Sequence, residues 1–252
     1  MVIVPALGES VLGWVPVWRE LARSTRVFVY DRAGNGWSDS PSPGRRTFDD
    51  MAEELHRTLV AAGVAPPYLV VAHSMGGIIA RRFAARYPGD MAGMVLVDSS
   101  HEDQVRRLGT TWRQTRWLLR VLVRPAGLRR LAASAGLTPQ LHAELDREVP
   151  PEYRAATRAI WLSSRQRRIV AREVLMIMSS RGLPPDLGSL PLTVLTAAER
   201  QAGWEQLQAE LAATSTRGQH LMAGQGGHYI QLDDPALVIK AIRDLLAGRP
   251  AI

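Results

Sequence analysis

The segment YLVVAHSMGGI, at positions 68–78, joins two different hydrophobic patterns at one serine. Residues 68–72 are apolar and mostly branched, as in a buried strand, and residues 75–87 have the spacing of a helix. The intervening residues fit a G-x-S-x-G pattern, with Ala72 in place of the first glycine. This context predicts a tight strand-to-helix turn that presents Ser74 as a nucleophile.

Small residues after Ser74 fit the crowding of such a turn, and Gly76 and Gly77 provide them. The turn would also set Ser74 at a helix N-terminus, where backbone N–H groups stabilise developing negative charge. The Met75 N–H is therefore the first expected oxyanion donor. The alternative is a Ser-Gly turn that only caps the helix, but the strand–turn–helix context favours the nucleophile.

Strand and helix patterns alternate on both sides of this segment. Further strands are predicted at residues 2–5, 26–30, 93–98, 192–196 and 219–223, and further helices at 14–22, 48–62, 202–213 and 235–247. Thr47 is the expected N-cap of the helix at 48–62. The alternation predicts an α/β fold with a mostly parallel central sheet and helices on both faces.

Residues 101–187 interrupt this alternation. They are rich in arginine and tryptophan, have helical periodicity and contain no convincing strand. We therefore expect a core formed by residues 1–100 and 188–252, with residues 101–187 as a helical insertion.

The composition fits one globular domain with an insertion. The chain has 252 residues, 46% of them hydrophobic, which is enough for a core and too many for a disordered chain. It has no cysteine, which excludes disulfides and thiolate metal sites. No apolar run approaches the ~18 residues of a membrane span, and the N-terminus lacks signal-peptide features, so the predicted location is cytoplasmic.

The net charge of +7 is concentrated in one segment. Residues 101–185 hold 16 arginines and 7 acidic residues, whereas the remainder of the chain is slightly acidic. The arginines are predicted to form a solvated face; the alternative is a surface that attracts anionic substrates or an anionic membrane surface. A nucleic-acid partner is not expected, because the sequence lacks the interleaved basic and aromatic residues of known binding modules.

Three motifs together resemble the α/β-hydrolase superfamily. The segment YDRAGNGWSD (30–39) is similar to its D-x-x-G-x-G-x-S loop, residues 72–77 to its nucleophile elbow, and GHYIQLDDP (227–235) to its catalytic-histidine loop. Their order and spacing extend the resemblance over nearly the whole chain. The resemblance implies the α/β-hydrolase fold, a helical cap formed by the insertion, and a serine hydrolase that needs no metal or organic cofactor.

The resemblance assigns the base and leaves two candidates for the acid. His228 follows the last predicted strand in a glycine-rich loop and is the expected general base for Ser74. Asp98 ends the strand after the elbow helix and is the favoured acid, as in some members of the superfamily. Other members carry the acid after the next core strand, where Glu199 is the alternative.

Backbone and aromatic groups complete the predicted site. The superfamily takes its second oxyanion donor from the loop after the strand at residues 2–5, where the Leu7 N–H is the candidate. The superfamily often has His-Gly in this loop, whereas this chain has Ala-Leu. Trp112, Trp117 and Trp161 of the insertion are candidates for an apolar acyl pocket, with ordinary burial inside the cap as the alternative.

The superfamily usually has two strands before residues 2–5, and this sequence does not contain them. Their loss would leave residues 26–30 as an edge strand, and edge strands invite pairing. We therefore expect a homodimer, or another segment, to cover this edge.

The expected activity is hydrolysis of a carboxylic ester or related acyl bond in a small molecule. The reaction would pass through an acyl-enzyme, with Ser74, His228 and Asp98 as the triad. Lactonase, thioesterase, amidase, C–C hydrolase and perhydrolase activities use the same triad and stay open. The alternative from a different class is a non-catalytic member that binds a ligand under the cap.

Overall fold

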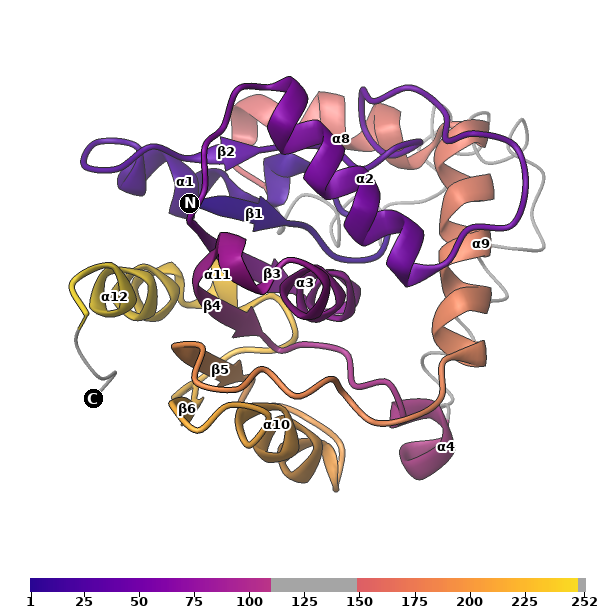
Figure 1. The fold of residues 1–252 in the computed structure, drawn as a ribbon. Coiled ribbons are helices and arrows are strands. Elements are labelled where there is room, and N and C mark those ends of the chain that lie inside the picture. The colour runs from indigo at the N-terminus through magenta and orange to yellow at the C-terminus, as the bar shows by residue number, and fades with distance from the viewer. Residues whose placement is uncertain (110–148, 249–252) are drawn as a thin grey trace.

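A computed structural model describes residues 1–109 and 149–248 of the chain (Figure 1). Its strands form one six-stranded parallel sheet in the order β2-β1-β3-β4-β5-β6. The strands are β1 (Val2–Val4), β2 (Phe28–Val29), β3 (Tyr68–His73), β4 (Met91–Val97), β5 (Leu192–Thr196) and β6 (Gly218–Met222). The predicted α/β fold with a parallel sheet is confirmed.

Helices connect the strands. Those of the core are α1 (Val15–Leu21), α2 (Phe48–Ala61), α3 (Met75–Arg86), α10 (Trp204–Ala212), α11 (Ile230–Asp233) and α12 (Pro235–Leu246). Those within residues 101–187 are α4 (Gln104–Leu108), α8 (Arg154–Trp161) and α9 (Ser164–Ser179). Short 3-10 helices are η1 (Val11–Trp14), η2 (Pro88–Asp90) and η3 (Pro151–Tyr153).

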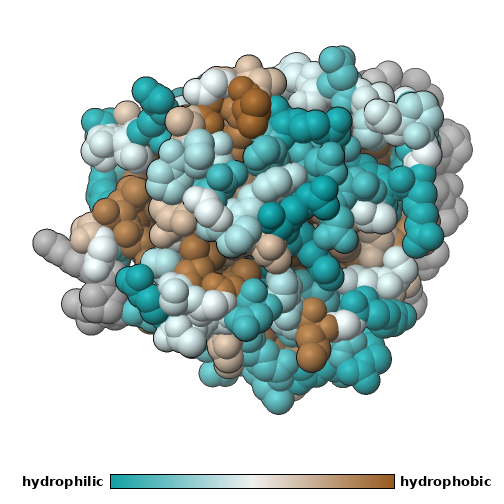
Figure 2. Space-filling model, in the orientation of Figure 1, coloured by the Kyte–Doolittle hydropathy of each residue, from teal (hydrophilic) through white to brown (hydrophobic). Residues whose placement is uncertain are grey.

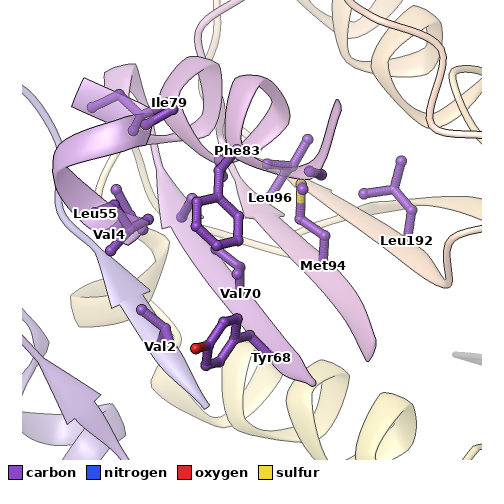
Figure 3. Close-up of a cluster of buried hydrophobic side chains, with 14 of the residues drawn as sticks. Val2, Val4, Leu55, Tyr68, Val70, Ile79, Phe83, Met94, Leu96 and Leu192 are labelled. Carbon is purple, nitrogen blue, oxygen red and sulfur yellow. The ribbon is translucent and has the colours of Figure 1, made fainter. Parts of the chain in front are cut away.

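Successive side chains of a strand point to opposite faces of the sheet, and both faces are buried. On one face, Val70 packs in a cluster with Leu55 of α2 and Phe83 of α3 (Figure 3). Its neighbour Val71 belongs to the cluster on the other face, together with Ile242 of α12. The core therefore consists of two apolar layers with the sheet between them.

Thr47 is the N-cap of α2, as predicted. Its hydroxyl accepts a hydrogen bond from the Asp50 N–H at 3.1 Å, and the Asp50 carboxylate accepts one from the Thr47 N–H at 2.8 Å. This reciprocal pair is a capping box, which satisfies two backbone donors that the helix itself leaves free.

The strand predicted at residues 26–30 is shorter in the structure. Only Phe28 and Val29 pair with β1, whose neighbouring residue Pro5 has no N–H to extend the ladder. β2 is the last strand on its side of the sheet, so its predicted edge position is confirmed. The homodimer expected to cover this edge stays a prediction.

The described part of residues 101–187, the segment expected to form an insertion, contains α4, α8 and α9 and has no helix after Ser179. Helix α9 runs along one side of the core, beside the loop that leads into α2 (Figure 1). Residues 110–148, which include Trp112 and Trp117, lie outside the described residues. Within the described residues, no helix combines the length and apolar character needed to cross a bilayer.

Candidate active site

Ser74 stands at the junction between β3 and α3 in a backbone conformation that few residues other than glycine adopt. Its φ is 51° and its ψ is −121°, and strain of this kind is common at functional sites. The end of β1 crosses the turn closely: a Cβ atom at Gly76 would lie 2.4 Å from the Val4 carbonyl oxygen. The geometry is that of the predicted nucleophile elbow, and it explains the small residue at position 76.

The loop after β1 leaves the Leu7 N–H free. Arg32 donates hydrogen bonds to the carbonyl oxygens of Pro5, at 2.5 Å, and Ala6, at 2.8 Å. Since the C=O and N–H of a trans peptide point in opposite directions, the Ala6 carbonyl on Arg32 turns the Leu7 N–H away from the guanidinium. Among the described residues, none accepts a hydrogen bond from the N–H of Leu7 or Met75. Both expected oxyanion donors are therefore available to a ligand.

His228 is bonded to Asp98. Its Nδ1 atom lies 2.5 Å from the Asp98 Oδ2 atom, although the two residues are 130 positions apart in the chain. Asp98 directly follows β4, and His228 lies in the loop between β6 and α11. The parallel sheet brings the two together because it sets the carboxyl ends of its strands along one edge.

Asp98 is fully buried and held by several donors. Its Oδ1 atom accepts hydrogen bonds from the Trp204 indole N–H at 2.8 Å and the Ala197 N–H at 3.2 Å, and Arg200 Nε lies 3.1 Å from Oδ2. Burial alone would raise the pKa of Asp98, but His228, Arg200 and Trp204 outweigh it and lower the pKa. Asp98 is therefore ionised at neutral pH and can fix His228 as the tautomer with its proton on Nδ1.

The surroundings of His228 favour its neutral form. Loss of solvation and the neighbouring His73 lower the pKa of His228 below its ordinary value of 6.5, while Asp98 acts in the opposite direction. With Nδ1–H donated to Asp98, the free Nε2 atom can accept a proton. No hydrogen bond joins the Ser74 hydroxyl to His228 among the described contacts. Bonds between a nucleophile and its base often form fully only when substrate binds.

A buried polar group lies behind His228. The Nε2 atom of His73 lies 2.9 Å from the His228 carbonyl oxygen, and its Nδ1 atom lies 3.1 Å from Glu9 Oε2. Burial would raise the pKa of Glu9, but His73, the Ala6 N–H and the Gln231 amide outweigh it, so the pKa is lowered. The Glu9 carboxylate and the His73 ring therefore link the loop after β1 to the loop that carries His228.

A second polar group joins α9 to the same loop. Glu173 of α9 accepts hydrogen bonds from Arg32 at 3.0 and 3.1 Å, from the Asn35 amide at 3.1 Å and from the Gly8 N–H at 3.3 Å. The side chains of Arg32 and Glu173 are each only 1% exposed. Arg32 thus connects a carboxylate of the insertion with the backbone that carries the Leu7 N–H.

Glu173→Gln is expected to lower the free energy of unfolding by about 3 to 5 kcal/mol, because it leaves the Arg32 charge buried without a counter-charge. Urea denaturation of both proteins measures the difference. The matched control is Glu152→Gln, which removes the partner of Arg19 in an ion pair that is about half exposed on both sides. We expect the control to cost less than about 1 kcal/mol. Equal losses in the two variants would contradict this role of Glu173.

The predicted site residues are brought together only in part. Asp98 and His228 are in contact, and Ser74 with Met75, like Leu7, follows the carboxyl end of a neighbouring strand, β3 or β1. Glu199 does not join them: its side chain is exposed, and only its backbone contacts the His228 loop, through the carbonyl oxygen of Gly226 at 3.2 Å. Trp161 packs with Leu7 against α9.

Several residues of the site were not predicted. Glu9, Arg32, Glu173 and Trp204 contact the predicted residues through side chains from distant parts of the chain. Arg32 lies inside the glycine-rich motif at residues 30–39, which was a signal for it. Nothing in the local pattern around the other three indicates their role. Within the described residues, no three potential ligand side chains gather as a metal site would require.

The family model for the alpha/beta hydrolase fold matches residues 1–235. The chain belongs to the α/β-hydrolase family. The match spans the elbow, Asp98 and His228, so the resemblance seen in the sequence motifs is confirmed at the level of the family. Membership establishes a hydrolase fold without fixing the bond that is cleaved.

Two bacterial relatives with different names are similar to this α/β hydrolase over most of its length. YqjL of Bacillus subtilis strain 168, described as uncharacterized, is 28% identical over 244 residues, covering 94% of this chain and 79% of the relative. A protein of Pantoea ananatis named as a candidate carbamate hydrolase, RutD, is 27% identical over 93% of this chain and 83% of its own.

Solved structures share the fold. A thermophilic esterase from Thermogutta terrifontis superposes with a TM-score of 0.69 at 23% identity, over 98% of this chain and 89% of its own. An enol-lactonase from Burkholderia xenovorans LB400 has a TM-score of 0.69 at 18% identity, over 98% and 90% of the two chains. At these identities the likeness concerns the fold alone.

Proposed function

We propose that this α/β hydrolase cleaves a carboxylic ester, or a related acyl bond, of a small molecule through an acyl-enzyme. The observation that carries the proposal is the 2.5 Å contact between His228 and the buried Asp98, combined with a serine held at φ 51° on the adjoining turn. An ionised carboxylate, a neutral imidazole and a serine on a tight turn are the three groups of a Ser-His-Asp triad on a nucleophile elbow.

In the proposed reaction, the Ser74 hydroxyl attacks the acyl carbonyl while His228 Nε2 takes its proton. The oxyanion accepts hydrogen bonds from the N–H groups of Leu7 and Met75. His228 then gives the proton to the leaving alcohol, which departs and leaves Ser74 acylated. Water then attacks the acyl-enzyme and gives its proton to His228, which returns a proton to the Ser74 oxygen as the acid is released. Asp98 holds the imidazole and stabilises its charged form throughout.

The apolar surroundings of Leu7 favour an acyl group without charge. Leu7 and Trp161 pack against Val170 and Val174 of α9. A Cβ atom at Gly8 would lie 2.7 Å from the Val170 side chain and 3.2 Å from Trp161, so the loop and the insertion are in close contact. We therefore expect an ester with an uncharged alkyl or aryl acyl chain as the substrate. The rates of hydrolysis of p-nitrophenyl esters of increasing chain length would show which length is preferred.

A fluorophosphonate probe is expected to label the protein at Ser74, because such probes react with serines activated by a neighbouring base. Peptide mass spectrometry locates the label. The Ser74→Ala variant should remain unlabelled, and labelling of the unchanged protein should be blocked by prior denaturation. A folded protein that takes no label would instead favour a non-catalytic member of the family that binds a ligand.

The pH dependence of hydrolysis should follow the neutral form of His228. Because only the neutral imidazole accepts the serine proton, kcat/KM is expected to rise with pH and reach half its plateau below pH 6.5, the ordinary value for histidine. Arg200→Gln removes a positive charge that lowers the pKa of His228, so the midpoint should move upward in that variant. A midpoint at or above pH 6.5 in the unchanged protein would contradict this assignment.

A further inference from the structure

A cleft of about 480 Å³ lies between α9, α3 and the segment that leads into α2. Its volume is in the range of small-molecule sites. Apolar side chains of Phe48, Met51, Ile169 and Met176 line part of it. Neither Ser74, His228 nor Asp98 belongs to its lining, so it is a cavity separate from the triad.

Helix α9 separates the cleft from the proposed acyl site. Val170 and Val174 face Leu7 and Trp161, whereas Ile169, Arg172 and Met176 line the cleft. Figure 2, in the orientation of Figure 1, shows hydrophilic residues spread over the side of the molecule where α9 lies. One face of α9 therefore contacts the loop of the proposed acyl site, and another face lines the cleft.

The cleft carries positive charge that the carboxylates of the described residues neutralise only in part. Arg45, Arg82 and Arg172 line it, and none of them forms an ion pair with a described residue. The Arg82 Nε atom is buried and has no hydrogen-bond partner among the described residues. By contrast, Arg46, also in the lining, pairs with Glu54. Unpaired guanidinium groups beside a concave surface attract and bind oxyanions.

The two carboxylates in the lining do not cancel this charge. Glu173 is committed to Arg32 and Asn35 on the core side of α9. Asp49 is exposed, in the first turn of α2. One exposed carboxylate thus faces Arg45, Arg82 and Arg172 around an apolar floor. Arg181 also lines the cleft without an ion pair to a described residue, and it donates to the Met178 and Ser180 carbonyls.

We propose that this cleft binds an amphiphilic anion, in which a phosphate or carboxylate group is attached to an alkyl chain. The anionic oxygens would accept hydrogen bonds from Arg82 and Arg172, with Arg45 at the rim. The alkyl chain would lie against Phe48 and Met176. Such a molecule could be free in solution or could be a lipid in a membrane surface, and both sources present the same chemistry. This site does not depend on the activity of Ser74.

Isothermal titration calorimetry with octyl phosphate tests the proposal directly. We expect one saturable site in the unchanged protein and in Arg57→Ala, a control at an exposed arginine of α2 outside the cleft. Arg172→Ala and Arg45→Ala are expected to weaken binding, by about tenfold for Arg172, since a charge-assisted hydrogen bond is lost. Both arginines are exposed, so these variants should fold normally, and thermal melts check this.

Further ligands separate the contributions of headgroup and tail. Inorganic phosphate and the neutral analogue octanamide should each bind more weakly than octyl phosphate. Sedimentation with phosphatidylglycerol vesicles distinguishes the source: loss of vesicle binding in Arg172→Ala would identify a membrane lipid, and binding of octyl phosphate without vesicle binding a free amphiphile. The proposal is overturned if octyl phosphate does not bind, if octanamide binds equally well, or if the arginine variants bind as the unchanged protein does.

Discussion

Replacing Ser74 with alanine is expected to lower kcat for hydrolysis of a p-nitrophenyl ester by about 10⁶-fold. Without the hydroxyl no acyl-enzyme forms, and water must attack the substrate directly. The residual rate would come from binding and from the N–H groups of Leu7 and Met75, which stabilise the oxyanion without a nucleophile. Initial rates with saturating ester measure kcat.

The matched control for this prediction is Ser42→Ala, at an exposed serine distant in sequence from the turn. It should retain the activity of the unchanged protein. Circular dichroism of both variants would confirm that the sheet is intact. Activity of Ser74→Ala within tenfold of the unchanged protein would exclude this serine as the nucleophile and with it the proposed mechanism.

Asp98→Asn is expected to lower kcat by about 10⁴-fold while leaving the fold in place. The asparagine amide would donate to His228 Nδ1, so the imidazole proton would move to Nε2, the atom that must accept the serine proton. Trp204 and Ala197 both donate to Oδ1 of Asp98, and the asparagine oxygen can replace that acceptor. Because the change also removes the counter-charge of Arg200, some stability should be lost too, and circular dichroism checks that the variant is folded before kcat is compared.

Glu199→Gln is the control that separates the two candidates for the acid. Because the Glu199 side chain is exposed, its variant is expected to keep full activity. Steady-state kinetics of the two variants, under identical conditions, decide between them. A large loss in Glu199→Gln with an active Asp98→Asn would reverse the assignment.

The sequence was most informative where a function depends on local geometry. The run at residues 68–78 predicted β3, the turn at Ser74 and α3, because a strand, small residues and a helix must follow one another there. Asp98 was predictable as a polar residue directly after a buried strand. The edge position of β2 followed from the superfamily resemblance. Its length of two residues depends on its pairing with β1, which cannot be predicted from the local sequence.

Contacts between distant side chains were not predictable. Glu173 lies in an arginine-rich segment that suggested a solvated face, and its burial against Arg32 appears only once α9 packs on the core. Glu9 likewise looks like an ordinary loop residue until His73 and Gln231 approach it. These contacts depend on tertiary packing, and a single sequence contains no pairwise information from which to infer it.

The ion pair between Arg32 and Glu173 constrains any exchange of the insertion by protein engineering. A chimera that carries another hydrolase's helices in place of residues 101–187 would lose the Glu173 carboxylate and leave Arg32 buried and uncompensated. Arg32 also donates hydrogen bonds to the Pro5 and Ala6 carbonyl oxygens. The graft would therefore disturb the backbone of the core as well as the helices packed on it. Successful transplants should therefore carry an acidic residue at the matching point of the new helix or replace Arg32 with an uncharged side chain.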